Sequence, residues 1–139
     1  MSDFFEAIVD EPGLAPRRAT KYSAGIDFFS PRDLEILPGT MQVVYTGYGF
    51  RHIFSGYGMI ADRSSNYMKG VRVFRGVIDG DYRGEIIIVL ENFSSSPVKF
   101  DKDTAVAQML LQEISWLTER IKPQDKIRGT GGFGSTVRI

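Results

Sequence analysis

The sequence predicts an all-β domain of the sandwich or barrel type, with one short helix. Short runs rich in β-branched and aromatic residues recur along the chain, and glycine and proline turn signals such as Pro38-Gly39 separate them. This spacing is typical of many short antiparallel strands. A chain of 139 residues with 42% hydrophobic and 24% charged residues is expected to form one domain around a single core.

The expected elements follow the chain in order. Residues 1–23 are mixed and are expected to hold an early strand and a loop. The run 41–50 is rich in β-branched and aromatic residues and predicts one strand, whereas the continuous apolar run 86–90 predicts a fully buried strand. Residues 64–69 are expected to form the short helix. Further strands are expected at 26–29, 57–61, 98–100 and 105–114.

The composition excludes several kinds of chemistry and of partner. The chain has no cysteine and a single histidine, His52, so thiolate zinc sites, cysteine nucleophiles and multi-histidine metal sites are excluded. We expect acid–base chemistry from carboxylates, and a hard, oxygen-bound cation such as Mg²⁺ if a metal takes part. The zero net charge argues against nucleic-acid binding. Neither a secretory signal nor a membrane span is recognisable, so an intracellular location is expected, nuclear or cytosolic.

The C-terminal tail concentrates groups that bind phosphate and stack on a base. Its glycines allow backbone N–H groups to turn inward around an anion. Arg128 can bind a phosphate through two parallel hydrogen bonds, and Phe133 offers a flat face for a base. We therefore expect residues 128–139 to form a mobile lid over a phosphorylated ligand, which the domain of residues 1–127 holds.

Two further segments carry candidate chemistry. Arg63 precedes two serines at the start of the expected helix and is a candidate phosphate anchor; a surface helix capped by Ser64 or Asp62 is the alternative. Asp79 and Tyr82 lie in segment 76–85, where Asp-Gly is also typical of a β-hairpin turn. A carboxylate beside an aromatic ring can activate a water against a sugar-phosphate.

Five segments, taken in order, carry a family resemblance. They are Ala24-Gly25-Ile26-Asp27, Arg63-Ser64-Ser65 with Lys69-Gly70, residues 76–85 (Gly-Val-Ile-Asp-Gly-Asp-Tyr-Arg-Gly-Glu), Val106-Ala107-Gln108-Met109, and residues 128–136 (Arg-Gly-Thr-Gly-Gly-Phe-Gly-Ser-Thr). This series resembles the five motifs of the homotrimeric deoxyuridine triphosphatase (dUTPase) family. The resemblance implies a distorted jelly-roll β-barrel, the dUTPase-like β-clip, with active sites at the subunit interfaces. It also implies hydrolysis of dUTP to dUMP and pyrophosphate with Mg²⁺, which limits uracil in DNA and supplies dUMP for dTMP synthesis.

The resemblance assigns roles around the reacting phosphorus and the nucleoside. Asp79 would orient and deprotonate the water that attacks the α-phosphorus, and would contact the deoxyribose 3′-hydroxyl. Tyr82 would pack under the sugar and exclude a 2′-hydroxyl. The backbone of Gly76, Val77 and Ile78 would read the uracil edge.

It also assigns phosphate and metal contacts. Arg63, Ser64 and Ser65 would hold the phosphates, and Gln108 would lie close to them. Asp27 would act on Mg²⁺ indirectly, through a water molecule. Considered without the resemblance, Asp27 is also consistent with a solvated strand-edge carboxylate and Gln108 with an outward-facing side chain.

The last set of implied roles belongs to the tail. Arg128, Ser135 and Thr136 would clamp the terminal phosphates, Phe133 would cap the uracil, and Gly134 would lie at the substrate beside them. The resemblance further implies that the tail reaches a neighbouring chain of the homotrimer.

Departures from the family pattern leave two alternatives. Asp62 stands where the second motif usually has proline, Asp103 and Ala105 replace a glycine and a basic residue of the fourth, and Val137 replaces a glycine after the tail. Asp62 and the stretch from Lys69 to Gly76, which is slightly shorter than usual, motivate a catalytically weak dUTPase-like scaffold that acts through protein binding. A dCTP deaminase relative is the second alternative, although its glutamate would align with Val89.

Overall fold

The computed structural model describes residues 4–115 and 127–133. In this part of the chain, eleven strands and one short helix confirm the predicted all-β class. The strands are β1 (Phe5–Ala7), β2 (Ile26–Phe29), β3 (Leu34–Ile36), β4 (Met41–Tyr45), β5 (Tyr48–Phe50), β6 (Gly56–Ala61), β7 (Val71–Val73), β8 (Val77–Asp79), β9 (Ile87–Asn92), β10 (Val98–Phe100) and β11 (Ala105–Glu113), and the helix is α1 (Ser64–Met68).

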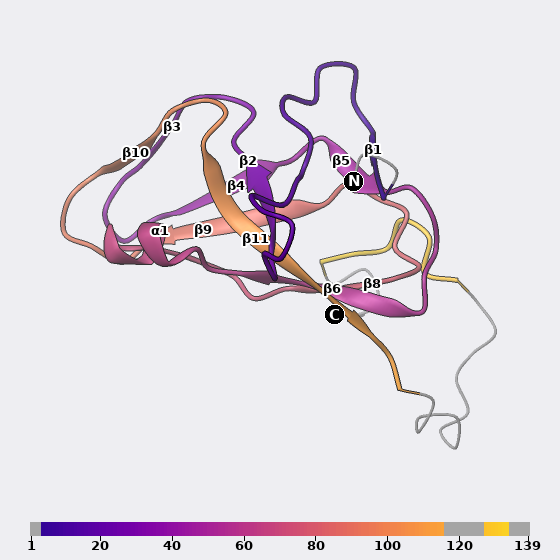
Figure 1. The fold of residues 1–139 in the computed structure, drawn as a ribbon. Helices are drawn as coiled ribbons and strands as arrows, with labels where there is room; N and C mark the ends of the chain where they lie inside the picture. Colours follow the sequence, from indigo (N-terminus) through magenta and orange to yellow (C-terminus); the bar gives the residue numbers. More distant parts are fainter. Residues whose placement is uncertain (1–3, 116–126, 134–139) are drawn as a thin grey trace, which may run out of the picture.

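The described strands pair as four antiparallel sheets. The largest sheet has the order β2-β11-β6-β8 and the next has the order β4-β9-β7, while β1-β5 and β10-β3 are two-stranded. In Figure 1 the long strand β11 runs from the end of the molecule with β3 and β10 toward β6 and β8. Most paired strands are distant in the sequence, so folding brings separate motifs onto one sheet.

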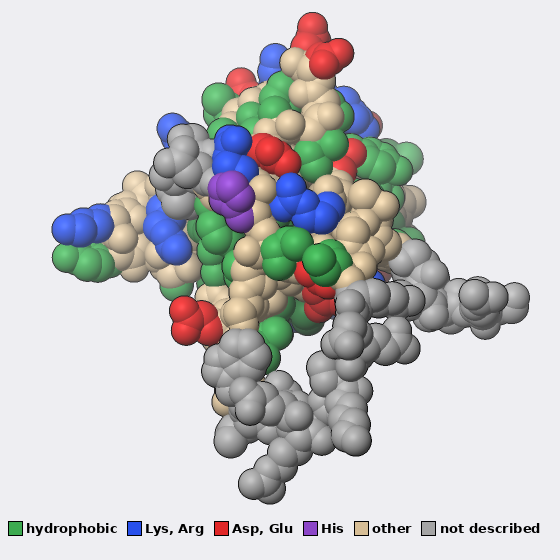
Figure 2. All heavy atoms as spheres, turned by 90° about the vertical axis from the view of Figure 1, so that its right-hand side faces the viewer, with side chains coloured by type: hydrophobic (Ala, Val, Ile, Leu, Met, Phe, Trp, Pro, Cys, Tyr) green, Lys and Arg blue, Asp and Glu red, His purple; other side chains and the backbone are tan. Residues whose placement is uncertain are grey.

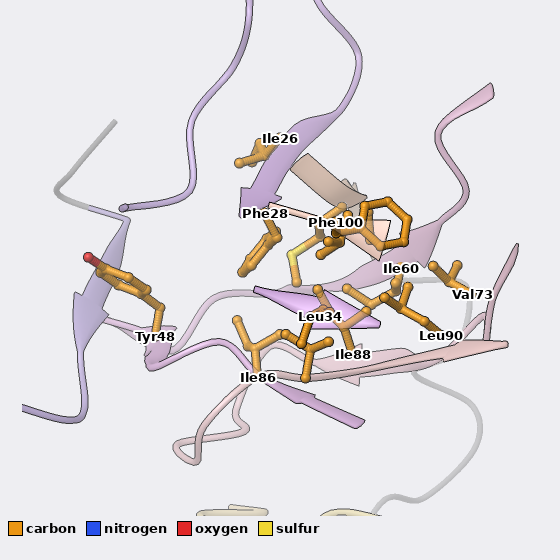
Figure 3. Packing of buried hydrophobic residues seen from close by; sticks show 14 of the residues in the cluster. Ile26, Phe28, Leu34, Tyr48, Ile60, Val73, Ile86, Ile88, Leu90 and Phe100 are labelled. Carbon is orange, nitrogen blue, oxygen red and sulfur yellow. The ribbon is translucent and has the colours of Figure 1, made fainter. Parts of the chain in front are cut away.

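The core is built from side chains that alternate along the strands. β6 and β9 bury every second residue, as strands with one face on a core do. Ile88 is 1% and Leu90 0% exposed, whereas Ile87 and Val89 are half-buried on the opposite face. The prediction of a fully buried strand over 86–90 is therefore wrong, because only one face of β9 meets the core. Figure 3 shows the buried side chains that meet in this core.

The run 41–50 forms two strands, so the prediction of one continuous strand is also wrong. The chain turns between β4 and β5 at Gly47, whose φ of +80° lies in the left-handed region. A Cβ at this position would lie 2.9 Å from the Pro12 Cα. The glycine therefore serves both the turn and the close approach of the N-terminal loop, which a count of apolar residues does not reveal.

Segment 76–85 is not a hairpin closed on Asp79-Gly80. Its strand β8 pairs with the earlier strand β6, with Asp79 opposite Tyr57. After β8 the chain makes a turn in which the Tyr82 N–H donates to the Asp79 carbonyl at 3.0 Å. The local Asp-Gly signal marked the turn correctly, but the pairing partner came from a distant part of the chain.

The remaining predictions agree with the structure. The short helix and an early strand are present, and the strands expected at 26–29, 57–61, 98–100 and 105–114 are found with small shifts at their ends. β3 and β7 were not predicted, because three residues carry too short a pattern. Within residues 4–115 and 127–133, no helix has the length and apolar character to cross a membrane.

Candidate active site

The sequence-predicted site residues divide between two pockets. The Asp79 pocket, of about 400 Å³, contains Gly76, Val77, Ile78, Asp79, Tyr82, Arg128 and Phe133. The Arg63 pocket, of about 330 Å³, contains Asp27, Arg63, Ser64, Ser65 and Gln108. Gly134, Ser135 and Thr136 lie outside the described residues. Every predicted site residue that the structure describes therefore lines one pocket or the other.

Asp79 ends β8 and is paired with the arginine of the tail. The Arg128 Nε and Nη2 atoms each lie 2.6 Å from the Asp79 Oδ2. The Arg128 backbone N–H donates to the Asp81 Oδ2 at 2.7 Å. Two successive aspartates of segment 76–85 thus bind one tail residue, one through its side chain and the other through its backbone.

Glycines allow the tail to approach the Tyr82 ring. Gly129 has a φ of +67°, forms a parallel bridge with Tyr82, and accepts a hydrogen bond from the Arg83 N–H through its carbonyl. A Cβ on Gly132 would lie 3.2 Å from the Tyr82 Cε1. Bulkier residues in the tail would therefore hold its backbone away from the ring.

Tyr82 itself is held by its hydroxyl. That hydroxyl donates to the Glu85 carbonyl at 2.6 Å. Burial, and secondly the negative charge of Glu85, raises the pKa of the Tyr82 phenol. The phenol therefore stays protonated near neutral pH and presents a rigid, neutral ring to the pocket.

The Arg63 pocket lies at the other end of the same sheet. Arg63 directly precedes α1 in an extended conformation, and its Nε lies 3.3 Å from the Asp27 Oδ1. No side chain caps α1 with a hydrogen bond, so the alternative of a helix capped by Ser64 or Asp62 is wrong. Asp27 is also not a fully solvated carboxylate, because its side chain is 15% exposed.

Gln108 faces this pocket because Gly25 leaves it room. A Cβ on Gly25 would overlap the Gln108 amide. The Gln108 Nε2 donates to the Asp62 carbonyl at 2.8 Å. The alternative of an outward-facing glutamine is therefore wrong, since this side chain joins β11 to the segment that carries Arg63.

Within one chain, the Asp79 pocket and the Arg63 pocket are far apart on the largest sheet. Across the largest sheet Asp27 pairs with Gln108, which pairs with Ala61, whereas Asp79 pairs with Tyr57, which pairs with Gln112. With rises of about 3.4 Å per residue and spacings of about 4.8 Å per strand, Asp27 and Asp79 are roughly 20 Å apart. The triphosphate part of a nucleotide is shorter than this backbone separation.

Phe74 and Glu85 are among the residues of the Asp79 pocket that the sequence did not assign to the site. Phe74 lines it and packs its ring 6.2 Å from that of Phe133, at an interplanar angle of 43°. Glu85 lines it as well and accepts the Gly47 N–H at 2.8 Å through its carboxylate. The signal available in the sequence was the position of Phe74, an aromatic residue only two positions before the predicted site residue Gly76.

The charged groups on the face of Figure 2 are mixed. Basic and acidic side chains lie next to one another there, in keeping with the 17 basic and 17 acidic side chains of the chain. Among the described residues, no group of three or more histidine, cysteine, aspartate or glutamate side chains is placed to hold a metal. Asp27 is the carboxylate that lines the Arg63 pocket, and carboxylate oxygens are ligands that Mg²⁺ accepts.

Comparisons with known proteins identify the family. The dUTPase family model matches residues 11–137. A Candida glabrata protein named deoxyuridine 5′-triphosphate nucleotidohydrolase is 36% identical over 130 residues, covering 91% of this chain and 90% of its own length. A Mus musculus protein of the same name is 37% identical, covering 92% of this chain and 81% of its own. The crystal structure of dUTPase from Streptococcus mutans is 31% identical with a TM-score of 0.70, covering 81% of this chain and 96% of that chain.

These matches place the protein among the nucleotide hydrolases built on a jelly-roll-like β-barrel, as the sequence predicted. The chain belongs to the dUTPase family. The dCTP deaminase alternative receives no support, because Val89 lies on the outer face of β9 and lines neither pocket.

Proposed function

We propose that this chain hydrolyses dUTP to dUMP and pyrophosphate, with Asp79 as the base. The observation that carries the proposal is the Asp79 pocket, in which a carboxylate, the Tyr82 ring, the Arg128 guanidinium and the Phe133 ring surround one cavity. Through this reaction the protein would limit the incorporation of uracil into DNA and supply dUMP for dTMP synthesis.

In the proposed reaction Asp79 accepts a proton from a water while the water oxygen bonds to the α-phosphorus. The bond from that phosphorus to the oxygen bridging the β-phosphorus breaks, and pyrophosphate leaves with the electron pair. A carboxylate is a weak base. Cations around the phosphates must therefore make the phosphorus electrophilic, and Arg63 and Arg128 are the arginines that line the two pockets.

Base recognition is expected from the open edge of β8. The Ile60 N–H donates to the Gly76 carbonyl, and the Gly80 N–H to the Gly56 carbonyl, so alternate residues of β8 face β6. The N–H and carbonyl of Val77 consequently point away from β6, at the edge of the sheet. One donor and one acceptor side by side match the edge of uracil, which also presents both.

Mg²⁺ is the proposed cofactor. Asp27 would hold it through a water molecule in the Arg63 pocket, where Ser64 and Ser65 would bind the phosphates. When bound, the ion would neutralise phosphate charge and polarise the phosphorus. The pairing of Asp27 with Arg63 keeps the carboxylate oriented toward that pocket.

The complete site is proposed to form between chains of a homotrimer. The roughly 20 Å between Asp27 and Asp79 within a chain supports this, since a neighbour can bring its Arg63 pocket to the Asp79 pocket. A second support is the apolar outer face of the β4-β9-β7 sheet. Met41 is 70%, Tyr45 55% and Val43 37% exposed there, an arrangement suited to an interface with another copy.

Residues 128–139 are proposed to be the lid. The described part of the tail lies on segment 76–85 of its own chain, whereas the resemblance implies a neighbour's segment. The contacts of Arg128 with Asp79 and Asp81 are compatible with a tail on its own chain and with a tail on a neighbouring chain. Every chain of a homotrimer presents the same segment 76–85.

Pyrophosphate release with Mg²⁺ from dUTP, dCTP, dTTP and UTP, measured side by side, tests the function. Rapid release from dUTP alone is expected, because the edge of β8 and the Tyr82 ring select the base and the sugar. Release from none of the four would refute the proposal and favour the scaffold that acts through protein binding.

A further inference from the structure

Asp62, which replaces the family's usual proline, makes two hydrogen bonds at the junction of β6 and α1. Its Oδ1 accepts the Val73 N–H at 2.6 Å. Its backbone carbonyl accepts the Gln108 Nε2 at 2.8 Å. The residue immediately before the phosphate anchor Arg63 is thus fixed through both its side chain and its backbone.

The carboxylate points away from the Arg63 pocket. Successive residues of an extended chain project to opposite sides, and Arg63 is extended, with φ of −95° and ψ of 132°. Arg63 lines its pocket and pairs with Asp27, whereas Asp62 does not line that pocket. The negative charge of Asp62 is therefore directed to the Val73 backbone and does not compete with a phosphate for Arg63.

The bond to Val73 also joins the two larger sheets. β7 is the last strand of the β4-β9-β7 sheet, and the Phe74 N–H donates to the Val89 carbonyl of β9 at 2.9 Å. The N–H of Val73, one residue earlier, therefore points away from β9, toward Asp62. Proline lacks an acceptor side chain and cannot make this bond. A buried backbone N–H that loses its acceptor is costly.

We propose that Asp62 is a positioning residue for Arg63 and, through it, for the phosphates of the substrate. By bonding Val73 on one side and Gln108 on the other, it holds the peptide before Arg63 between β7 and β11. The inference rests on the proposed function, since it assumes that Arg63 binds the triphosphate. The inference also explains how aspartate can stand where the family usually has proline. The hydrogen bond that its side chain accepts would hold the backbone that the proline ring otherwise makes rigid.

The test compares the binding of two nucleotides to Asp62 variants. The first is the non-hydrolysable imido analogue of dUTP, which needs Arg63, and the second is dUMP, which lacks the β- and γ-phosphates. For Asp62→Ala we expect the Kd of the imido analogue to rise about tenfold, as loss of one hydrogen bond to a charged acceptor implies. The Kd of dUMP should stay within about twofold. Asp62→Asn keeps an acceptor oxygen and should restore most of the affinity.

Asp33 offers a matched control. Its Oδ1 accepts the Lys102 N–H at 2.7 Å, the same kind of bond, and it lines neither pocket. Asp33→Ala removes a bond that is exposed, unlike that of Asp62, and should leave both Kd values unchanged. If Asp62→Ala does not fold, Asp62→Ser gives the same test, because its shorter side chain is not expected to reach Val73.

The outcomes separate this inference from the proposed function. Equal losses for both nucleotides, an Asp62→Asn variant as weak as Asp62→Ala, or no loss at all would each overturn the positioning role. A wild-type chain that binds neither nucleotide and releases no pyrophosphate from dUTP would overturn the proposed function, and this inference with it. A wild-type chain that binds and hydrolyses dUTP leaves the Asp62 comparison as the deciding result.

Discussion

The Arg128 guanidinium lies against the Asp79 carboxylate, with Nε and Nη2 each 2.6 Å from the same oxygen, Oδ2. The residue proposed to clamp the phosphates is therefore the partner of the proposed base. A phosphate that draws Arg128 away from this oxygen would free it to accept the proton of the water. Substrate binding and activation of Asp79 would then be one event.

Asp79→Asn should abolish turnover while the nucleotide still binds. The amide keeps the shape and an acceptor oxygen but does not take up the proton, so kcat should fall by about 10²–10⁴-fold. The measurement is dUTP turnover together with the Kd of the imido analogue. Near-normal turnover would remove Asp79 from the role of base.

Arg128→Lys should not replace arginine. A lysine ammonium is a point charge without the planar fork that binds a carboxylate or phosphate through two donors. We expect kcat/KM for dUTP to fall on the order of 10-fold to 100-fold in Arg128→Lys, and further in Arg128→Ala. Steady-state kinetics check this, with Arg72→Lys as a control, because Arg72 pairs with Glu91 and lines neither pocket. A fully active lysine variant would show that charge alone suffices.

Deletion from Arg128 onward should leave a folded but nearly inactive chain. Among the described residues, the fully buried side chains of the hydrophobic core all lie within residues 5–109, so the unfolding transition should be retained. The activity should be lost because the Arg128 and Phe133 contacts to the Asp79 pocket disappear. Thermal unfolding and dUTP turnover are measured on the same sample. An active truncated chain would mean that the tail is not the lid.

Phe74→Ala should weaken nucleotide binding. The Phe74 ring packs 6.2 Å from Phe133 in the pocket, and an aromatic pair contributes about 0.5–1.5 kcal/mol. We therefore expect KM for dUTP to rise about twofold to tenfold with little change in kcat. Phe93→Ala is the control, since Phe93 packs on Tyr67 and lines neither pocket. Equal KM changes in both variants would argue against a specific contribution from Phe74.

Two inactive variants should restore each other if the site is shared between chains. Asp79→Asn removes the base of one pocket and Arg63→Ala the anchor of the other, which lie roughly 20 Å apart within a chain. Unfolding and refolding a mixture of the two should produce trimers in which some sites carry both native residues, and a fraction of wild-type activity should return. Separately refolded variants, combined without exchange, serve as the control. A mixture that stays inactive after proven subunit exchange would show that each site is built within one chain.

Local patterns identified the helix and most strands and predicted the candidate site residues that line the two pockets, because glycine turns and phosphate-binding side chains are properties of short segments. The same patterns failed where a distant segment decided the outcome. Gly47 breaks the run 41–50 at the point where Pro12 packs against it. Segment 76–85 pairs with β6 and not with itself, and β9 has one buried face because only one face of the β4-β9-β7 sheet packs on the core.

The sequence by itself determined the all-β class and the family and predicted the candidate site residues, since these depend on residue types in a fixed order along the chain. Only the tertiary structure decided how those residues are grouped. Strand pairing puts Asp27 beside Gln108 and Asp79 beside Tyr57, so one sheet carries two pockets at opposite ends. The contact of the Asp62 carboxylate with Val73 was likewise decided by tertiary structure. Hydrogen bonds between sheets depend on how distant segments pack and not on the residue order within each segment.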